Sequence, residues 1–392
     1  MKDKNKMEVP LFDLTRQYEK LRKDVLKKMD AVFTSGNVIM GSNVKAFEME
    51  IAKYLNVKHA VGVANGSDAL RISVHALDIH EGDYVITTPY TFFATASSIV
   101  LNGATPIFVD IEEKYYNINL NEVENILQTH PKKEKIKAVI PVHLFGKTVD
   151  LERLENISKK YKVHIIEDAA QSLGSVWYYN SSEKKFSGTV GDLGIYSFFP
   201  TKNLGAYGDG GLIVTNDDSL ADRVRRLRVH GATKKYFHEE IGVNSRLDEV
   251  QAAILRIKLK ELDNYIEKRI KKAKNYKDLF EEKKLYEYLD FPEYFDDRTH
   301  VYHQYVVTLK NPKERDKLSN FLKENGIGTS IYYPLGLHMQ KCFENLGYKQ
   351  GDFPVTEQAS KSTLALPMFP ELMKKEQQYL AEIIKKFYKN RL

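Results

Sequence analysis

Short apolar runs rich in β-branched residues alternate with amphipathic stretches through the first two-thirds of the chain. The apolar runs predict strands, and they are HAVGVA (59–64), DYVITT (83–88), TPIFVDI (105–111), KAVIPVHLFG (137–146), VHIIEDAA (163–170), LGIYSFF (193–199) and GLIVTN (211–216). In the stretches between them, such as SDALRISVHAL and DLERLENISKKY, apolar residues recur every three or four positions, which predicts helices. Seven strands with interposed helices predict an α/β fold with a mostly parallel sheet covered on both faces.

The pattern changes near residue 250, where long charged helical stretches begin. Residues 246–282 predict one extended helix. Short strands are expected within 300–309 and 328–334, and a terminal helix over 375–390. We therefore predict a large α/β domain over residues 1–250 and a smaller α+β domain over residues 251–392.

Composition narrows the class of protein. The chain has 392 residues, 42% of them hydrophobic, so it can bury a large core and a smaller one. Its net charge of +6 is spread over Lys-rich helices and offset by 53 acidic residues, which gives little support for nucleic-acid binding. No apolar run is long enough to cross a membrane, and a single cysteine excludes an intrachain disulfide. We expect a cytoplasmic protein that binds neither membranes nor nucleic acid, and no metal, because no His/Cys spacing typical of a zinc site occurs.

A lysine and a carboxylate stand at two predicted strand ends, where parallel sheets bind their ligands. Lys202 lies in SFFPTKNLGAYGDGG, whose glycines lead into another strand, so this segment is not a dinucleotide-binding loop. Asp168 ends the apolar run VHIIEDAA, and a buried carboxylate is costly without a cationic partner. A protonated pyridine nitrogen would supply that cation, and Gln171 could reach a phenolic oxygen on the same ring. His143, at another strand end, is either a satisfied core histidine or a cofactor contact.

Further residues near these strand ends could bind a phosphate and a flat ring. Gly66 and Ser67 open a helix after a strand, so their backbone N–H groups can point at a phosphate, and the Ser197 hydroxyl can join them. Phe92 follows a strand and could stack on a planar cofactor. Taken singly, an N-cap serine and a core phenylalanine are the simpler interpretations.

Asn244 and Arg246 precede a helix and offer an amide donor and a guanidinium to an anion, although either could be a cap or a surface residue. A lysine, a buried carboxylate, a phosphate cup and a stacking ring together are what pyridoxal phosphate requires. The lysine forms an imine with the cofactor, and the carboxylate keeps the ring nitrogen protonated so that the ring accepts electrons. The residues therefore predict a pyridoxal phosphate enzyme.

The chain resembles the DegT/DnrJ/EryC1/StrS family of nucleotide-sugar aminotransferases, a branch of the fold-type I pyridoxal phosphate enzymes. The resemblance runs from VPLFDLTRQY to LPMFPELMKKEQ, and its most specific motifs are SGNVIMG, NGSDAL, YTFFATA, VHLFG, EDAAQS, SFFPTKNLGAYGDGG, RVHG and GVNSRLDEVQAAIL. It implies that Lys202 carries the cofactor and that Asp168 and Gln171 hold its ring. It also implies a phosphate site and a stacking ring, formed by Gly66, Ser67, Ser197 and Phe92. In family dimers the asparagine of GVNSR, here Asn244, completes the phosphate site of the neighbouring subunit, so a homodimer with shared active sites is expected.

The resemblance further implies L-glutamate as amino donor and a nucleotide-linked ketosugar as acceptor, for cell-surface glycan biosynthesis. The motif spellings favour a UDP- or dTDP-linked 3-keto hexose, such as UDP-3-keto-N-acetylglucosamine. Relatives that act on 3-keto-uronates are expected to have a His-Tyr pair where this chain has Tyr332-Tyr333, which argues against a uronate. Arg246, Tyr333 and His338 resemble positions on the substrate side.

Three alternatives stay open: a 4-aminotransferase acting on a nucleotide-4-keto-6-deoxysugar, a sugar dehydratase, and a non-catalytic regulatory protein. Lys202 argues against the dehydratases, in which histidine replaces the lysine.

Overall fold

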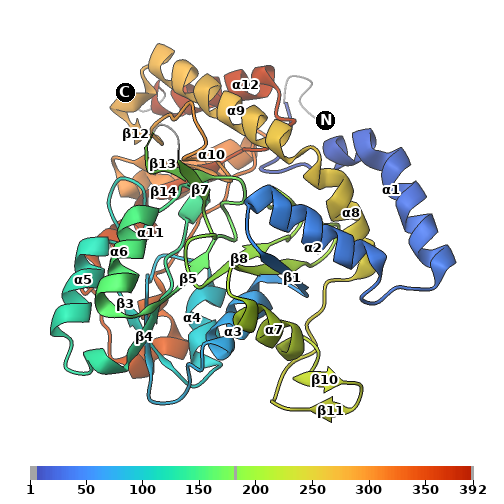
Figure 1. Ribbon diagram of the computed structural model, residues 1–392. Helices are drawn as coiled ribbons and strands as arrows, with labels where there is room; N and C mark the ends of the chain where they lie inside the picture. Colours follow the sequence, from blue (N-terminus) through green and yellow to red (C-terminus); the bar gives the residue numbers. More distant parts are fainter. Residues whose placement is uncertain (1–6, 181–182, 390–392) are drawn as a thin grey trace.

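The computed structural model describes residues 7–180 and 183–389, and the seven apolar runs form one sheet (Figure 1). Its strands, in spatial order, are β1 (His59–Val63), β9 (Gly211–Thr215), β8 (Leu193–Ser197), β5 (His164–Asp168), β4 (Ile136–Val139), β2 (Tyr84–Thr87) and β3 (Thr105–Phe108). Strand β9 pairs antiparallel with both β1 and β8, and the other neighbouring pairs are parallel. The mostly parallel seven-stranded sheet predicted from the sequence is confirmed.

Helices cover both faces of this sheet, because successive strand side chains point to opposite sides. On β5, Ile166 packs in the core with α3 (Gly66–Ala76), α4 (Phe93–Val100) and α7 (Asp218–Leu227). Ile165 packs on the other face with α5 (Leu120–Thr129) and α6 (Leu151–Tyr161). Helices α2 (Ser42–Leu55) and α8 (Glu249–Leu259) cover the β1, β8 and β9 part of the sheet. Because both faces of the strands are buried, their sequences are continuously apolar rather than alternating between apolar and polar residues.

Side-chain caps fix where several helices begin after the strands. Asn65 Oδ1 accepts a hydrogen bond of 2.8 Å from the backbone N–H of Asp68 at the start of α3. Asp217 caps α7 in the same way, accepting from the N–H of Leu220 at 2.8 Å. Such caps satisfy N–H groups that have no partner inside the helix.

A second core lies in the part of the chain after α8. It is formed by α9 (Leu262–Glu282), α10 (Arg315–Glu324), α12 (Lys374–Lys389) and a sheet of β12 (Leu289–Asp290), β13 (Tyr305–Leu309) and β14 (Thr363–Leu366). Tyr276, Phe280 and Tyr305 are fully or almost fully buried in it, and Val9 from the N-terminal segment joins them. The domain division at residue 250 stays a prediction.

Two predicted elements differ from the structure. The single helix expected over 246–282 is two helices, α8 and α9, which lets α8 pack on α2 while α9 continues into the second core. The strand expected over 328–334 is absent, and only a bridge between Ser330 and Ala365 forms there, at the free edge of β14. The terminal helix is α12, and Asn390 of the predicted range lies outside the described residues.

The remaining elements lie around these two cores (Figure 1). They are α1 (Thr15–Ser35), the hairpins β6 (Val176–Tyr178) with β7 (Lys184–Phe186) and β10 (Ala232–Lys234) with β11 (Phe237–His238), α11 (Pro354–Ser362), and 3₁₀ turns at Lys133–Lys135, Leu144–Gly146, Leu285–Glu287, Pro312–Glu314, Leu337–Met339 and Lys341–Leu346. Figure 1 shows the β10–β11 hairpin projecting from the body of the molecule. Within the described ranges, no helix has the length and apolar character needed to cross a membrane.

Arg269 of α9 ties this helix to two other segments of the second core. The side chain is only 1% exposed, and its Nη1 donates to the backbone carbonyls of Tyr302, His303 and Met368 at 3.1, 3.0 and 3.1 Å. Burial lowers the pKa of Arg269 to about 10. The carbonyl acceptors offset part of the cost of burying this charge.

We expect Arg269→Met to lower the free energy of unfolding by about 3 kcal/mol, because it removes three charge-assisted hydrogen bonds and leaves buried carbonyls without a donor. Lys271→Met, at an exposed position of the same helix, is the matched control and should change stability by less than about 0.5 kcal/mol. Urea unfolding followed by circular dichroism measures both, and equal effects of the two variants would contradict this role of Arg269.

Candidate functional site

Lys202 lies in a tight turn between β8 and β9. The turn is closed by hydrogen bonds from the N–H of Lys202 to the carbonyl of Phe199 and from the N–H of Ala206 to the carbonyl of Phe198, both 2.8 Å. A Cβ atom at Gly205 would stand 2.2 Å from the carbonyl oxygen of Pro200, so this turn requires glycine there. Burial lowers the pKa of Lys202 to about 8, and the negative charge of Asp168 opposes that shift. The amine therefore titrates much closer to neutrality than an ordinary lysine.

Asp168 ends β5, the strand beside β8, and its side chain is only 4% exposed. Its Oδ2 accepts a hydrogen bond of 2.8 Å from Thr95 Oγ1, and its Oδ1 accepts one of 3.2 Å from the N–H of Ala170. Burial raises the pKa of Asp168, while these two donors and the charge of Lys202 oppose the rise. Within the part of the chain that is described, no cation forms an ion pair with this carboxylate.

The preceding residue, Glu167, points to the opposite face of the sheet and is fully satisfied. Its oxygens accept from the N–H groups of Gly188, Val190 and Gly191 at 2.7, 2.6 and 2.7 Å, and from His143 Nε2 at 2.9 Å. The other ring nitrogen of His143, Nδ1, accepts from a backbone N–H. These donors hold the pKa of Glu167 below its usual range, although burial opposes them. His143 thus has partners at both ring nitrogens, as expected of a core histidine, and its contact with the cofactor stays a prediction.

Gln171 is held in place by two hydrogen bonds. Its Oε1 accepts from the N–H of Phe145 at 2.7 Å, and its Nε2 donates to the Tyr333 hydroxyl at 3.2 Å. Burial raises the pKa of Tyr333, so this hydroxyl stays protonated. The structure therefore brings Tyr333 next to Gln171, which lies three residues after Asp168 at the end of β5.

Gly66 and Ser197 come together at the N-terminus of α3. A Cβ atom at Gly66 would lie 2.8 Å from the Cβ of Ser197 and 3.2 Å from its hydroxyl oxygen, so only glycine fits at this position. Ser67, the next residue of the helix, is exposed. Free N–H groups at the start of this helix and the neighbouring hydroxyl form an arrangement that favours a phosphate.

The segment containing Asn244 and Arg246 lies beside the strand that leads into α3. Between them, Ser245 is buried and its hydroxyl accepts a hydrogen bond of 3.1 Å from the N–H of Ala64. Asn244 is exposed and Arg246 is partly buried. Phe92, which precedes α4, is 58% exposed in the isolated chain.

His338 has no hydrogen bond to the other predicted site residues. Its side chain is 2% exposed, its ring lies 4.8 Å from that of Phe353, and its Nε2 is 3.4 Å from Glu357 Oε1. Burial lowers the pKa of His338 despite the carboxylate of Glu357.

Sequence reasoning missed Thr95, which donates to Asp168, and Thr91, whose hydroxyl lies 3.0 Å from that of Thr95. The signal was present in TTPYTFFATAS, because residues four apart at a helix start lie on the same side. That this side would face Asp168 depends on how α4 packs on the sheet, which the sequence does not state.

The side chains fit pyridoxal phosphate. A buried carboxylate without a cation can pair with a protonated pyridine nitrogen, an amine of lowered pKa can attack an aldehyde, and a helix N-terminus beside Ser197 can take a phosphate. Among the described residues, no group of His, Cys, Asp and Glu could hold a metal ion.

Comparison with known proteins supports this assignment. The family model of the DegT/DnrJ/EryC1/StrS aminotransferases matches residues 19–385. A protein of Geobacillus stearothermophilus named pleiotropic regulatory protein is 49% identical over 384 residues, which cover 98% of this chain and 100% of that protein. The UDP-N-acetyl-3-dehydro-alpha-D-glucosamine 3-aminotransferase of Acidithiobacillus ferrooxidans is 37% identical over 378 residues, covering 96% of this chain and 97% of that enzyme.

The fold agrees with a solved structure as well. The crystal structure of a DegT DnrJ EryC1 StrS aminotransferase from Brucella abortus superposes with a TM-score of 0.89 at 34% identity and covers 97% of this chain and 99% of its own. Aminotransferases of this family depend on pyridoxal phosphate, which confirms the cofactor predicted from the sequence. The chain therefore belongs to the DegT/DnrJ/EryC1/StrS aminotransferase family, and it is an aminotransferase.

Proposed function

We propose that this enzyme transfers an amino group from L-glutamate to C3 of a nucleotide-linked 3-keto hexose carried on UDP or dTDP. One observation carries the chemistry: the buried carboxylate of Asp168 forms no ion pair with any residue that the structure describes, and it lies close enough to Lys202 for the two charges to shift each other's pKa. The substrate rests on the relatives, among them the 37% identical UDP-N-acetyl-3-dehydro-alpha-D-glucosamine 3-aminotransferase. An aminated sugar of this kind suits the biosynthesis of a cell-surface glycan.

In this proposal each residue predicted to bind the cofactor holds one part of it. Asp168 pairs with the ring nitrogen, Gln171 reaches the phenolic oxygen and Phe92 stacks on the ring. The phosphate is bound by the N-terminus of α3 and one hydroxyl, which involves Gly66, Ser67 and Ser197. When bound, the cofactor accepts the electrons left on the substrate carbon after a proton is removed.

Lys202 moves that proton. Its pKa of about 8, lowered by burial, means that a substantial fraction of the amine is neutral near physiological pH and can act as a base, whereas its conjugate acid returns the proton. Glutamate and the ketosugar use the same amine and the same carboxylate in turn. We therefore expect ping-pong kinetics.

Arg246 and Tyr333 are proposed to face the substrates. Arg246 is partly buried near the start of α8, where its guanidinium can bind an anionic group of the donor or the nucleotide. Tyr333 is held by Gln171, so a substrate that contacts its hydroxyl also contacts the network around the cofactor. His338 follows Tyr333 in the same segment of the chain. Its ring packs against Phe353, so we propose that it supports this segment rather than contacting the substrates.

A homodimer with shared active sites is part of the proposal. Large apolar side chains are exposed at both ends of α4 and in the segment before Asn244: Phe92 is 58%, Phe93 45%, Leu101 62% and Ile241 89% exposed. Apolar surface on this scale favours burial against another subunit. Asn244, exposed in the isolated chain, would then reach the phosphate of the neighbouring subunit.

The alternatives receive less support. A sugar dehydratase of this family has histidine where this chain has Lys202, and a regulatory protein has no need for an amine and a carboxylate buried together. The regulatory name of the 49% identical relative describes that protein. A 4-aminotransferase would use the same amine and carboxylate, so the position of the new amine on the product has to distinguish it.

The position of amination can be tested directly. We expect the enzyme, supplied with glutamate, to aminate UDP-3-keto-N-acetylglucosamine or a dTDP-3-keto-6-deoxyhexose at C3 and to leave dTDP-4-keto-6-deoxyglucose unchanged. Two-dimensional NMR of the isolated product locates the new amine. Amination of C4 alone would overturn the proposed substrate but not the aminotransferase assignment.

Replacing the lysine tests the chemistry itself. Lys202→Ala should lower kcat by at least about 10³-fold, because it removes the proton-transferring amine. It should also abolish the covalent attachment of cofactor that borohydride reduction produces in the wild type, as read by mass spectrometry. Lys260→Ala, at an exposed position of a helix end, is the control and should retain both properties. Transamination that persists in Lys202→Ala would refute the role of this residue.

The hydrogen bond from Thr95 should stabilise the ionised carboxylate of Asp168. Thr95→Val removes the hydroxyl that lowers the pKa of Asp168, so the ionised carboxylate loses a stabilising donor and pyridoxal phosphate should bind about tenfold more weakly. Thr95→Ser keeps the donor and should bind like the wild type. Fluorescence titration of the apoprotein with the cofactor gives both dissociation constants, and equal affinities of the Val and Ser variants would exclude this contribution.

A further inference from the structure

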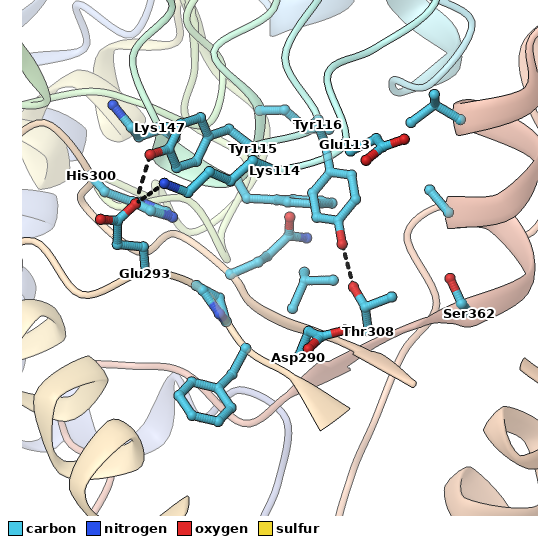
Figure 2. Close-up of a pocket in the computed structure, with 18 of the residues that line it drawn as sticks. Glu113, Lys114, Tyr115, Tyr116, Lys147, Asp290, Glu293, His300, Thr308 and Ser362 are labelled. Carbon is cyan, nitrogen blue, oxygen red and sulfur yellow. Dashed lines mark hydrogen bonds and ion pairs between the residues drawn. The ribbon is translucent and has the colours of Figure 1, made fainter. Parts of the chain in front are cut away.

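A second pocket of about 900 Å³ lies beyond the ends of β3 and β4, between this edge of the sheet and the β12, β13 and α11 segments (Figure 2). Its wall includes the aromatic side chains Tyr115, Tyr116, Phe145, Phe291 and Phe295, together with aliphatic and charged residues. None of the residues predicted for the cofactor or substrate lines it. The Leu144–Gly146 turn separates it from the active site, since the N–H of Phe145 faces Gln171.

Lys147 provides a cation in the wall of this pocket. The residue is only 7% exposed, and its Nζ lies 4.8 Å from the ring centre of Phe295, 5.2 Å from that of Tyr115 and 5.8 Å from that of Trp177. Its ammonium group forms neither a hydrogen bond nor an ion pair with any residue in the described ranges. Ring faces stabilise a cation but leave its N–H donors without a strong acceptor.

Two of the neighbouring carboxylates, Glu293 and Asp297, are engaged by other donors. Glu293 accepts from Lys114 and Tyr115, each at 2.7 Å, as Figure 2 shows. Asp297 accepts from the N–H and the hydroxyl of Thr299 at 2.8 and 2.7 Å. These carboxylates raise the pKa of Lys147 through space, yet burial outweighs them and lowers it. The lysine therefore still lacks a direct anionic partner.

We propose that this pocket is a second binding site, which takes a planar ring bearing one anionic group, with the anion paired to Lys147 and the ring lying among the aromatic side chains. A buried ammonium group gains most from an anion that replaces its lost water. Aromatic side chains offer a flat ring offset-stacked and edge-to-face contacts. The volume, of roughly the size common in ligand pockets, holds such a molecule.

Binding of 2-naphthoate to the holoenzyme tests this site. Borohydride reduction first fixes the cofactor on the enzyme, so that the catalytic site is occupied. Isothermal titration calorimetry should then show one 2-naphthoate per chain, and the neutral 2-naphthamide should bind at least about tenfold more weakly because it lacks the charge. A parallel titration with 2-naphthyl phosphate shows whether the anionic group favoured by the pocket is a carboxylate or a phosphate.

Two variants locate the bound anion. Lys147→Met should weaken 2-naphthoate binding at least about tenfold, whereas Lys147→Arg keeps the charge and should retain the affinity within about threefold. Gln358→Trp, at an exposed position that lines the pocket, should block binding without disturbing the core, and it carries the test if Lys147→Met does not fold.

Three results would overturn the proposal. They are failure of both anions to bind at millimolar concentration, equal affinity for 2-naphthoate and 2-naphthamide, and unchanged affinity in both Lys147→Met and Gln358→Trp. None of them bears on transamination, because the reduced enzyme is measured by binding alone.

Discussion

The buried carboxylate of Asp168 is the constraint on which the active site depends. It ends a central strand, is 4% exposed, and has a hydroxyl and a backbone N–H as donors but no cation among the described residues. A carboxylate in this position is stable only when positive charge lies near it. Lys202 supplies part of that charge from the turn after the adjacent strand, and in the proposed function the pyridine nitrogen of the cofactor would supply the rest.

Glu167 shows the other way in which a fold can hold a buried carboxylate. It has four donors, three of them backbone N–H groups, and its pKa is lowered, whereas that of Asp168 is raised. Two adjacent acidic residues therefore differ because the strand turns them to opposite faces. Glu167, with all its hydrogen bonds made inside the protein, fixes the strand to its neighbours. Asp168 has fewer donors, so a positively charged ligand group can stabilise its carboxylate.

The turn after β4 separates two kinds of binding surface. On one side the N–H of Phe145 orients Gln171, and through it Tyr333, at the cofactor site. On the other side the same turn ends in Lys147, which lies in the aromatic wall of the second pocket. One short segment thus contributes to both places, through the N–H of Phe145 on one side and the side chain of Lys147 on the other.

The sequence by itself determined the sheet, because seven apolar runs separated by amphipathic stretches have few other ways to bury both faces of their strands. It also indicated Lys202 and Asp168, since a charge at the end of an apolar strand requires a chemical reason. It did not predict that the helix breaks between α8 and α9 or that β14 pairs with β13. Both depend on which core each segment packs into, and no local sequence signal marks them. Only the tertiary structure decided three contacts: Thr95 with Asp168, Gln171 with Tyr333, and Lys147 with the three rings around it. Each contact joins residues far apart in the chain, and it forms because helices and turns pack on the sheet.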